Sequence, residues 1–350
     1  MTYKETLFFI GQSLTINHSN KNKIAIEKQL KENSVDWDAV VKVSTGHFVF
    51  PALYCNLKRA NFLHYLPEDL VNYMVHITDL NRERNRKIIA QAKEINELLL
   101  ANNITPIFLK GTGNLLEGLY EDIGERMVGD IDFIVSNKEY LKTINILKED
   151  GYDILEHNVA EFHRHYPSLG KKHNIAGVEV HKRLLREKYS PKFNYFHIKD
   201  SLIKLNNFHL ISNKNQFHYS ILVHQFNDYG IDYNTISLRK SYDIFLLSKK
   251  INVEKYLQDL ILFNNEVHCF IAIQNKILNT SLPCLNNHET RKHINNYYKL
   301  LDNKNYREKF HKNTKAKIIT LKRINLLINS IYKKEYRDWL VIKIKEKLRF

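Results

Sequence analysis

Apolar residues recur at helical spacing over most of the chain. The clearest segment is 80–102, where apolar residues three or four positions apart form one face of a predicted helix. They are Ile88, Ile89, Ala92, Ile95, Leu98 and Leu99. The pattern stops at Asn102 and Asn103, and asparagine tolerates the left-handed conformation in which helices often end. Similar spacing predicts helices at residues 216–226, 238–248, 253–263, 267–278 and about 315–350.

The pattern changes between residues 104 and 185. Short apolar runs there predict strands at residues 104–109, 130–135, 152–155 and 178–181, with 163–169 as a further candidate. Ser136 and Glu139 have the spacing of a capping box, so a helix is expected to begin there and to end at Gly151. Its inward residues would be Tyr140, Leu141, Ile144 and Leu147.

This order of elements predicts an α+β fold in which a mixed sheet is flanked by helices. The expected regions are an N-terminal helical region (1–103), an α/β core (104–200) and a C-terminal helical region (201–350). No linker rich in Pro, Gly or Ser separates them, so we expect them to pack as one body. Apolar residues make up 43% of the 350 residues, which is enough for a sizeable core.

Cysteine usage and hydropathy indicate a cytoplasmic protein without a membrane-spanning segment. Cys55, Cys269 and Cys284 are far apart and form no zinc motif, so they are expected to be reduced thiols. The first residues lack the pattern of a signal peptide. No stretch of eighteen uncharged apolar residues occurs, so no transmembrane helix and no membrane partner are expected.

The formal net charge is +15, and its excess is concentrated at the C-terminal end. Residues 301–350 contain fifteen Lys or Arg and five Asp or Glu, which gives +10 for this region alone. Such a basic region attracts polyanions, most obviously RNA or DNA. The alternative is a solvated helical surface that is simply rich in lysine.

The segment 109–135 contains the most informative residues. Asp130 and Asp132 are two positions apart on a predicted strand, so both carboxylates point to the same face. Two such carboxylates repel each other unless a cation lies between them, and Mg²⁺ prefers hard oxygen ligands. A pair of metal ions can activate an attacking hydroxyl and stabilise departing pyrophosphate. Taken alone, the two aspartates could equally be solvated acids at a strand end.

Glu179 is the best candidate for a third carboxylate. Val178 and Val180 would face the core, which leaves Glu179 and His181 on the opposite face of their strand. If this strand lies beside the one at 130–135, Glu179 completes a metal site with the two aspartates. An isolated exposed strand glutamate would be solvated without a further role.

The residues Lys110-Gly111-Thr112-Gly113 are expected to form a turn after a buried strand. Glycines there let a backbone approach a phosphate closely, and Lys110 or Thr112 could add contacts to the phosphate. The spacing is not that of a P-loop, and a G-x-G sequence is most often a simple turn. Arg126 could reach a triphosphate or hold the carboxylates; otherwise it is a surface arginine.

Two pairs of residues at helical i, i+4 spacing are candidates for supporting roles. His224 and Asp228 could pair, and the simplest interpretation is a buried histidine bonded to its neighbour. The functional alternative is that His224 shapes the nucleotide pocket. Arg239 and Asp243 have the same spacing, which favours a salt bridge within a helix.

Together these residues resemble a bacterial family of uncharacterised nucleotidyltransferases, the NTP-transferase type 5 family of the DNA polymerase β-like superfamily. The match covers roughly residues 40–250 and is most specific at 109–135 and Glu179. The matching positions are Leu109-Lys110-Gly111, Leu119-Tyr120, Gly124, Arg126, Asp130-Ile131-Asp132 and Val178-Glu179-Val180-His181. Less specific matches are His47, Pro51, Leu53, His224, Arg239 and Asp243. The spacing from Gly111 to Asp130 is longer than is usual in the superfamily, and Thr112 replaces its second small residue.

The resemblance implies a polymerase β-like nucleotidyltransferase core that uses an NTP, such as ATP, and Mg²⁺ or Mn²⁺. Nucleoside monophosphate would be transferred to an acceptor hydroxyl, a reaction of EC 2.7.7 type. Asp130, Asp132 and Glu179 would bind metal, and Glu179 or a metal-bound water would take the acceptor proton. Lys110, Gly111, Thr112 and Arg126 would meet the nucleotide.

The sequence leaves the acceptor open. RNA, including a tRNA end, is the first expectation because of the basic C-terminal region. A protein hydroxyl, as in a toxin or other modifying enzyme, and a small molecule such as an aminoglycoside or sugar are the alternatives. Two other functions remain: a glycosyltransferase that uses a D-x-D motif, and an inactive homologue that binds nucleotide or RNA. The first leaves Lys110, Gly111 and Glu179 unexplained, and the second leaves three carboxylates unexplained.

Overall fold

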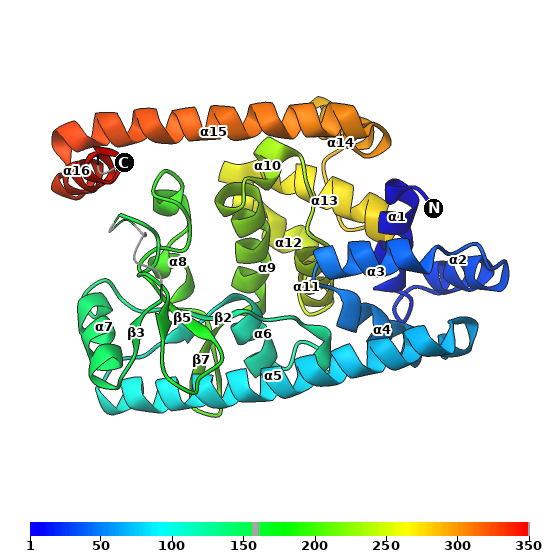
Figure 1. The fold of residues 1–350 in the computed structure, drawn as a ribbon, viewed down its shortest axis with the longest axis horizontal. Coiled ribbons are helices and arrows are strands. Elements are labelled where there is room, and N and C mark those ends of the chain that lie inside the picture. Colours follow the sequence, from blue (N-terminus) through cyan, green and yellow to red (C-terminus); the bar gives the residue numbers. More distant parts are fainter. Residues whose placement is uncertain (156–159, 161, 349–350) are drawn as a thin grey trace.

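The computed structural model describes residues 1–155, 160 and 162–348. Within these residues, a mixed sheet lies among helices that precede and follow it along the chain (Figure 1). The predicted α+β class with flanking helical regions is confirmed. No helix among the described residues is long and apolar enough to cross a membrane.

The N-terminal region is helical. Its helices are α1 (Tyr3–Ser13), α2 (Asn20–Lys31), α3 (Trp37–Gly46), α4 (Phe50–Arg59) and α5 (Glu68–Ala101). Helix α5 runs along one side of the sheet (Figure 1), where the Gln91 amide donates to the Ala176 carbonyl at 3.0 Å. Asn103 follows it with a φ of 59°, so the predicted helix end at this asparagine is confirmed.

The sheet has seven strands within the described residues, in the order β3-β4-β5-β2-β1-β7-β6. The strands are β1 (Ile107–Phe108), β2 (Asp130–Ile134), β3 (Asp153–Ile154), β4 (Leu169–Gly170), β5 (Gly177–His181), β6 (Leu202–Leu205) and β7 (Phe208–Ile211). The central strand β2 pairs in parallel with β5 and antiparallel with β1. The sheet is therefore mixed, as expected.

Two helices belong to the region of the sheet. They are α6 (Lys110–Glu117) and α7 (Tyr140–Glu149). The expected turn at 110–113 is wrong, because these residues form the first turn of α6. Helix α7 begins after the predicted start at Ser136, and Leu141, expected to point inward, is 70% exposed. The sheet also continues to Ile211, beyond the boundary at 200, because β6 and β7 were missed.

Helices follow the sheet to the end of the described chain. They are α8 (Tyr195–Ile198), α9 (Asn213–Leu222), α10 (Gly230–Tyr233), α11 (Leu238–Ser248), α12 (Val253–Leu257), α13 (Asn264–Leu278), α14 (His288–Asp302), α15 (Lys304–Tyr332) and α16 (Lys334–Leu348). The single helix expected over about 315–350 is interrupted at Lys333, whose backbone is extended (φ −119°, ψ 123°). One hydrophobic cluster extends from Leu7 to Leu301, so helices and sheet share a continuous core.

Candidate active site

The three expected carboxylates lie on two adjacent strands in the middle of the sheet. In the parallel register of β2 and β5, Asp132 is directly opposite Glu179. Because side chains alternate along a strand, Asp130, Asp132, Glu179 and His181 share one face of the sheet. Intervening residues such as Ile131 are fully buried on the other face. The pairing of these two strands agrees with the sequence analysis.

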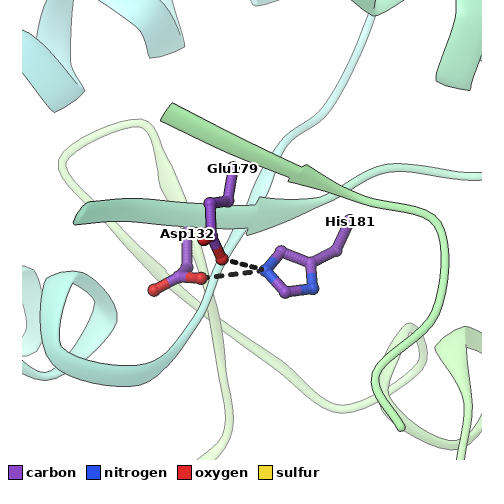
Figure 2. Close-up of side chains that lie close together, drawn as sticks. All are labelled: Asp132, Glu179 and His181. Atoms are coloured by element: carbon purple, nitrogen blue, oxygen red, sulfur yellow. Dashed lines mark hydrogen bonds and ion pairs between the residues drawn. The ribbon is translucent and has the colours of Figure 1, made fainter. Parts of the chain in front are cut away.

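Asp132, Glu179 and His181 converge tightly (Figure 2). The His181 Nε2 atom lies 2.8 Å from Asp132 Oδ1 and 3.4 Å from Glu179 Oε2. Each of the three side chains offers a ligand atom within 4.8 Å of the others, close enough to surround one metal ion. Asp130 stands outside this set, next to Gly177 on β5. A Cβ atom at Gly177 would lie 3.2 Å from Asp130 Oδ1.

Lys110 brings an ammonium group to the same carboxylates. Its Nζ atom donates to Asp132 Oδ1 at 2.5 Å and lies 3.6 Å from Glu179 Oε2. The charge of Asp132 raises the pKa of Lys110 even though burial opposes this, so the group stays protonated. One ammonium neutralises only part of the charge of three carboxylates. A divalent cation at this position would compensate the remainder, and the oxygen ligands suit it.

The pKa values of two carboxylates move in opposite directions. Burial raises the pKa of Asp130 from its ordinary value of 3.8, and the negative charges of Glu179 and Asp132 raise it further. Burial would also raise the pKa of Glu179. The hydrogen bond from His181 and the charge of Lys110 outweigh burial and hold that pKa well below 4.5. Glu179 is therefore ionised, and the repulsion among the three carboxylates appears as the raised pKa of Asp130.

The first turn of α6 is fastened to β2 and to α9. The Thr112 hydroxyl is buried and donates to the Asp130 carbonyl at 2.9 Å. The Gln216 amide donates to the Lys110 carbonyl at 3.1 Å. Lys110 itself has a φ of 52°, the left-handed region that non-glycine residues rarely adopt. These contacts place the Lys110 side chain over the carboxylates, and they occupy the Thr112 hydroxyl that was expected to meet phosphate.

Arg126 is buried and pairs with Asp243 of α11. Two guanidinium nitrogens lie 3.0 Å from the Asp243 carboxylate, and Nη1 donates to the Met127 carbonyl at 2.7 Å. The Tyr120 hydroxyl also donates to Asp243, at 2.7 Å. A Cβ atom at Gly111 would lie 3.4 Å from Arg126 Nη2, so glycine lets α6 pack closely on this arginine. Arg126 therefore links α6 to α11 next to the carboxylates.

The two pairs expected within helices have other partners in the structure. Asp243 pairs with Arg126 rather than with Arg239, whose guanidinium donates to the Met127 carbonyl at 3.1 Å. Burial and the charge of Arg126 lower the pKa of Arg239 to about 10. His224 bonds to the Thr235 carbonyl at 2.9 Å rather than to Asp228. Both expected i, i+4 pairings are therefore wrong.

His165 is a site residue that the sequence analysis did not single out. It forms an antiparallel bridge with His181, and its Nε2 atom lies 3.6 Å from Glu179 Oε2. Its Nδ1 atom lies 2.7 Å from the Tyr166 carbonyl. Burial lowers the pKa of His165 to about 3, so the ring is neutral at physiological pH. The signal in the sequence was the alternation of His163 and His165 in a candidate strand.

Comparison with known protein families identifies the family of the chain. A family described as uncharacterised nucleotidyltransferase matches residues 33–273, which is more than half of the chain. The chain belongs to this nucleotidyltransferase family. The family resemblance seen in the sequence is thereby confirmed. No curated protein and no solved structure matches the chain.

The matched span shows which parts of this nucleotidyltransferase are shared with its family. It begins just before α3 and includes both strands that carry the carboxylates. It also includes α11, which supplies Asp243. The span ends within α13, so α14 and the basic helices α15 and α16 lie outside it.

Proposed function

We propose that this chain transfers a nucleoside monophosphate from an NTP to an acceptor hydroxyl, with Asp130, Asp132 and Glu179 as the catalytic carboxylates. The observation that carries the proposal is the parallel register of β2 and β5, which places Asp132 opposite Glu179 on the face of Asp130. Membership in the nucleotidyltransferase family supports the same reaction class.

The carboxylates fit a divalent metal ion, and we propose Mg²⁺ or Mn²⁺. Three acidic side chains lie on one face, and Lys110 compensates only part of their charge. A bound ion would polarise the α-phosphate and stabilise the leaving pyrophosphate. Asp132 and Glu179 would hold the ion, and Asp130 would extend the site toward the solvent-exposed end of β2.

The residues around the carboxylates orient the reactants. Glu179 is ionised, so it can accept the proton of the attacking hydroxyl as that oxygen bonds to the α-phosphorus and pyrophosphate departs. Its low pKa makes it a weak base, so positioning and electrostatic stabilisation must supply most of the rate. Lys110 lies against the cluster and could contact a phosphate oxygen. Thr112 and Arg126 position α6 and Lys110 from beneath.

We propose RNA, including the end of a tRNA, as the acceptor. Residues 301–350 carry ten of the fifteen net positive charges, and most of α15 and α16 is exposed. Helix α16 is docked beside the sheet region through Tyr336, which stacks on Phe162 with ring centroids 3.9 Å apart. The basic surface thus lies against the segment that leads to His165. The three cysteines are free thiols, which fits a cytoplasmic enzyme.

The acceptor can be identified by following the label. Purified protein would be incubated with each α-³²P-labelled NTP, Mg²⁺ or Mn²⁺, and either total RNA, protein lysate or small hydroxylated acceptors such as aminoglycosides. The proposal expects label in RNA. Label found in protein or in a small molecule would refute the RNA acceptor and retain the reaction class. A nucleotide sugar that supports transfer while no NTP does would refute the reaction class itself.

A further inference from the structure

We propose that His165 is an additional metal ligand, and that it makes the site selective for a first-row transition ion of the Mn²⁺, Co²⁺ or Zn²⁺ class over Mg²⁺. The inference deepens the proposed function, because it rests on a metal ion at Asp132 and Glu179. It concerns which ion the site takes, and it assigns His165 and His181 different roles.

The hydrogen bonds of His165 leave one ring nitrogen free to bind a metal. A backbone carbonyl only accepts hydrogen bonds, so Nδ1, 2.7 Å from the Tyr166 carbonyl, carries the proton of the ring. The Nε2 atom then has a lone pair, and it lies 3.6 Å from Glu179 Oε2. Metal-binding histidines are usually held in this way, with the second nitrogen donating to a carbonyl.

Two hydrogen-bond acceptors that face each other at this distance are favourable only when a cation or a proton donor binds both of them. The lone pair of His165 Nε2 and the Glu179 carboxylate repel each other when nothing positive intervenes. Ligands that each lie about 2.1 Å from a metal ion can be separated by such a distance. Lys110 reaches the other side of Glu179 at 3.6 Å, so a divalent ion would compete with this ammonium for the same oxygens.

His181 has the opposite arrangement. Its Nε2 atom lies 2.8 Å from Asp132 Oδ1, so Nε2 carries the proton and donates to the carboxylate. Its Nδ1 atom is buried and has no hydrogen-bond partner within the described chain. If Nε2 bound a metal, the proton would move to Nδ1 and lose its acceptor, which is costly in a buried site. His181 is therefore a positioning residue for Asp132, although it lies close enough to be a ligand (Figure 2).

The ligand set determines the preferred ion. Mg²⁺ favours oxygen ligands and keeps much of its water, whereas imidazole suits the later first-row ions. Those ions also bind oxygen sites somewhat more tightly, so a simple affinity ranking would not test the proposal. The discriminating quantity is the effect of removing the His165 imidazole on each ion separately.

The test uses the full chain and does not depend on activity. Co²⁺ affinity would be measured by visible absorption and Mg²⁺ affinity by competition, and ¹⁴N hyperfine coupling to bound Mn²⁺ would report imidazole coordination. His165→Phe and His165→Gln should weaken Co²⁺ binding about tenfold or more, leave Mg²⁺ binding within about twofold, and abolish the ¹⁴N coupling.

His163→Phe is the matched control. The His163 ring packs against His165 with ring centroids 4.3 Å apart, and its replacement should change neither metal affinity nor the coupling. His181→Gln should weaken both ions and retain the coupling.

Several outcomes would overturn the inference. Wild-type Co²⁺ affinity in both His165 variants, equal losses for Co²⁺ and Mg²⁺, or coupling that disappears in His181→Gln alone would each contradict it. If those results appeared while the wild type still transferred label and Asp132→Asn lost the metal, the proposed function would stand and only the role of His165 would fall. Metal binding that survives in Asp132→Asn, or no metal binding in the wild type, would overturn both.

Discussion

At the scale of single residues, the site depends on close packing at the start of α6. Lys110 adopts a left-handed conformation there, and the following turn of α6 packs closely on the end of β1. A Cβ atom at Gly113 would lie 3.0 Å from the Phe108 carbonyl oxygen and 3.2 Å from its carbon, both backbone atoms that cannot move aside. Glycine at this position therefore sets the distance between α6 and the sheet, and with it the height of Lys110 above Asp132.

We expect Gly113→Ala to displace the first turn of α6. The substitution should lower the free energy of unfolding by about 1–3 kcal/mol, as overpacking does, and reduce label transfer. Gly129→Ala is the matched control, because a Cβ atom at Gly129 meets nothing within 4 Å. Urea denaturation and the transfer assay measure both effects. Equal stability and activity for the two variants would show that the contact with Phe108 does not position α6.

Side-chain alternation explains which site residues the sequence reveals. Asp130, Asp132 and Glu179 lie in regular strands, where a period of two decides which face each residue takes. His165 lies in an irregular segment that meets β5 through one isolated bridge, so no period places it. Lys110 was recognised from its sequence context, but its contact with Asp132 depends on a backbone conformation that the sequence does not indicate.

At the scale of elements, a buried polar network joins the segment before β2 to α6, α9 and α11. Arg126 pairs with Asp243, which also accepts from Tyr120. Tyr120 accepts from the Asn114 amide, and the Gln216 amide in turn donates to the Asn114 oxygen and to the Lys110 carbonyl. A substitution of Asp243 on α11 should therefore alter the position of Lys110 through this chain of hydrogen bonds.

We expect Asp243→Asn to destabilise the fold strongly. The substitution keeps the shape of the side chain but leaves the buried Arg126 charge unpaired, which typically costs about 3–5 kcal/mol. The control is Asp259→Asn, which breaks an exposed pair with Lys214 and should cost less than about 1 kcal/mol. Urea denaturation at pH 7 compares them. A loss for Asp243→Asn no larger than for the control would contradict a structural role for the pair.

At this scale, the sequence pattern did not predict ion-pair partners that are distant in the chain, the hairpin of β6 and β7, or the end of α15. The i, i+4 spacing suggested Arg239 for Asp243, but Arg126 is 117 positions away and takes that place. The sequence pattern did not predict the hairpin of β6 and β7. In the structure, Asn206 and Asn207 form its tight two-residue turn, and both have the positive φ that such a turn requires. The break between α15 and α16 falls at Lys333, without glycine or proline, where Glu187 binds Lys333 and Tyr336.

At the scale of the whole molecule, helices and sheet enclose one core that buries several neutral histidines. Burial lowers the pKa of His218 and of His224 to about 4, and each ring bonds a backbone carbonyl. In the unfolded chain these rings take up a proton near pH 6.5. Protonation between pH 6.5 and about 4 therefore favours the unfolded state, and stability must fall as the pH is lowered through this window.

We expect the free energy of unfolding to decrease from pH 7 to pH 5, by on the order of 1–2 kcal/mol for each such histidine. His218→Gln can keep the bond to the Tyr256 carbonyl but cannot titrate. Its loss of stability between pH 7 and pH 5 should be smaller than that of the wild type by this amount. Denaturant titrations at both pH values measure the difference. Identical pH dependence in the two proteins would show that His218 does not contribute.

The most direct test of the account is the rate of label transfer from α-³²P-labelled NTP by single variants of the three carboxylates. Asp130→Asn, Asp132→Asn and Glu179→Gln change charge without changing size, and circular dichroism would verify that each variant folds. Each variant is expected to lose at least about a hundredfold in rate, because groups that stabilise transition-state charge contribute factors of this size. A folded variant of any of the three that transfers label at the wild-type rate would contradict the account.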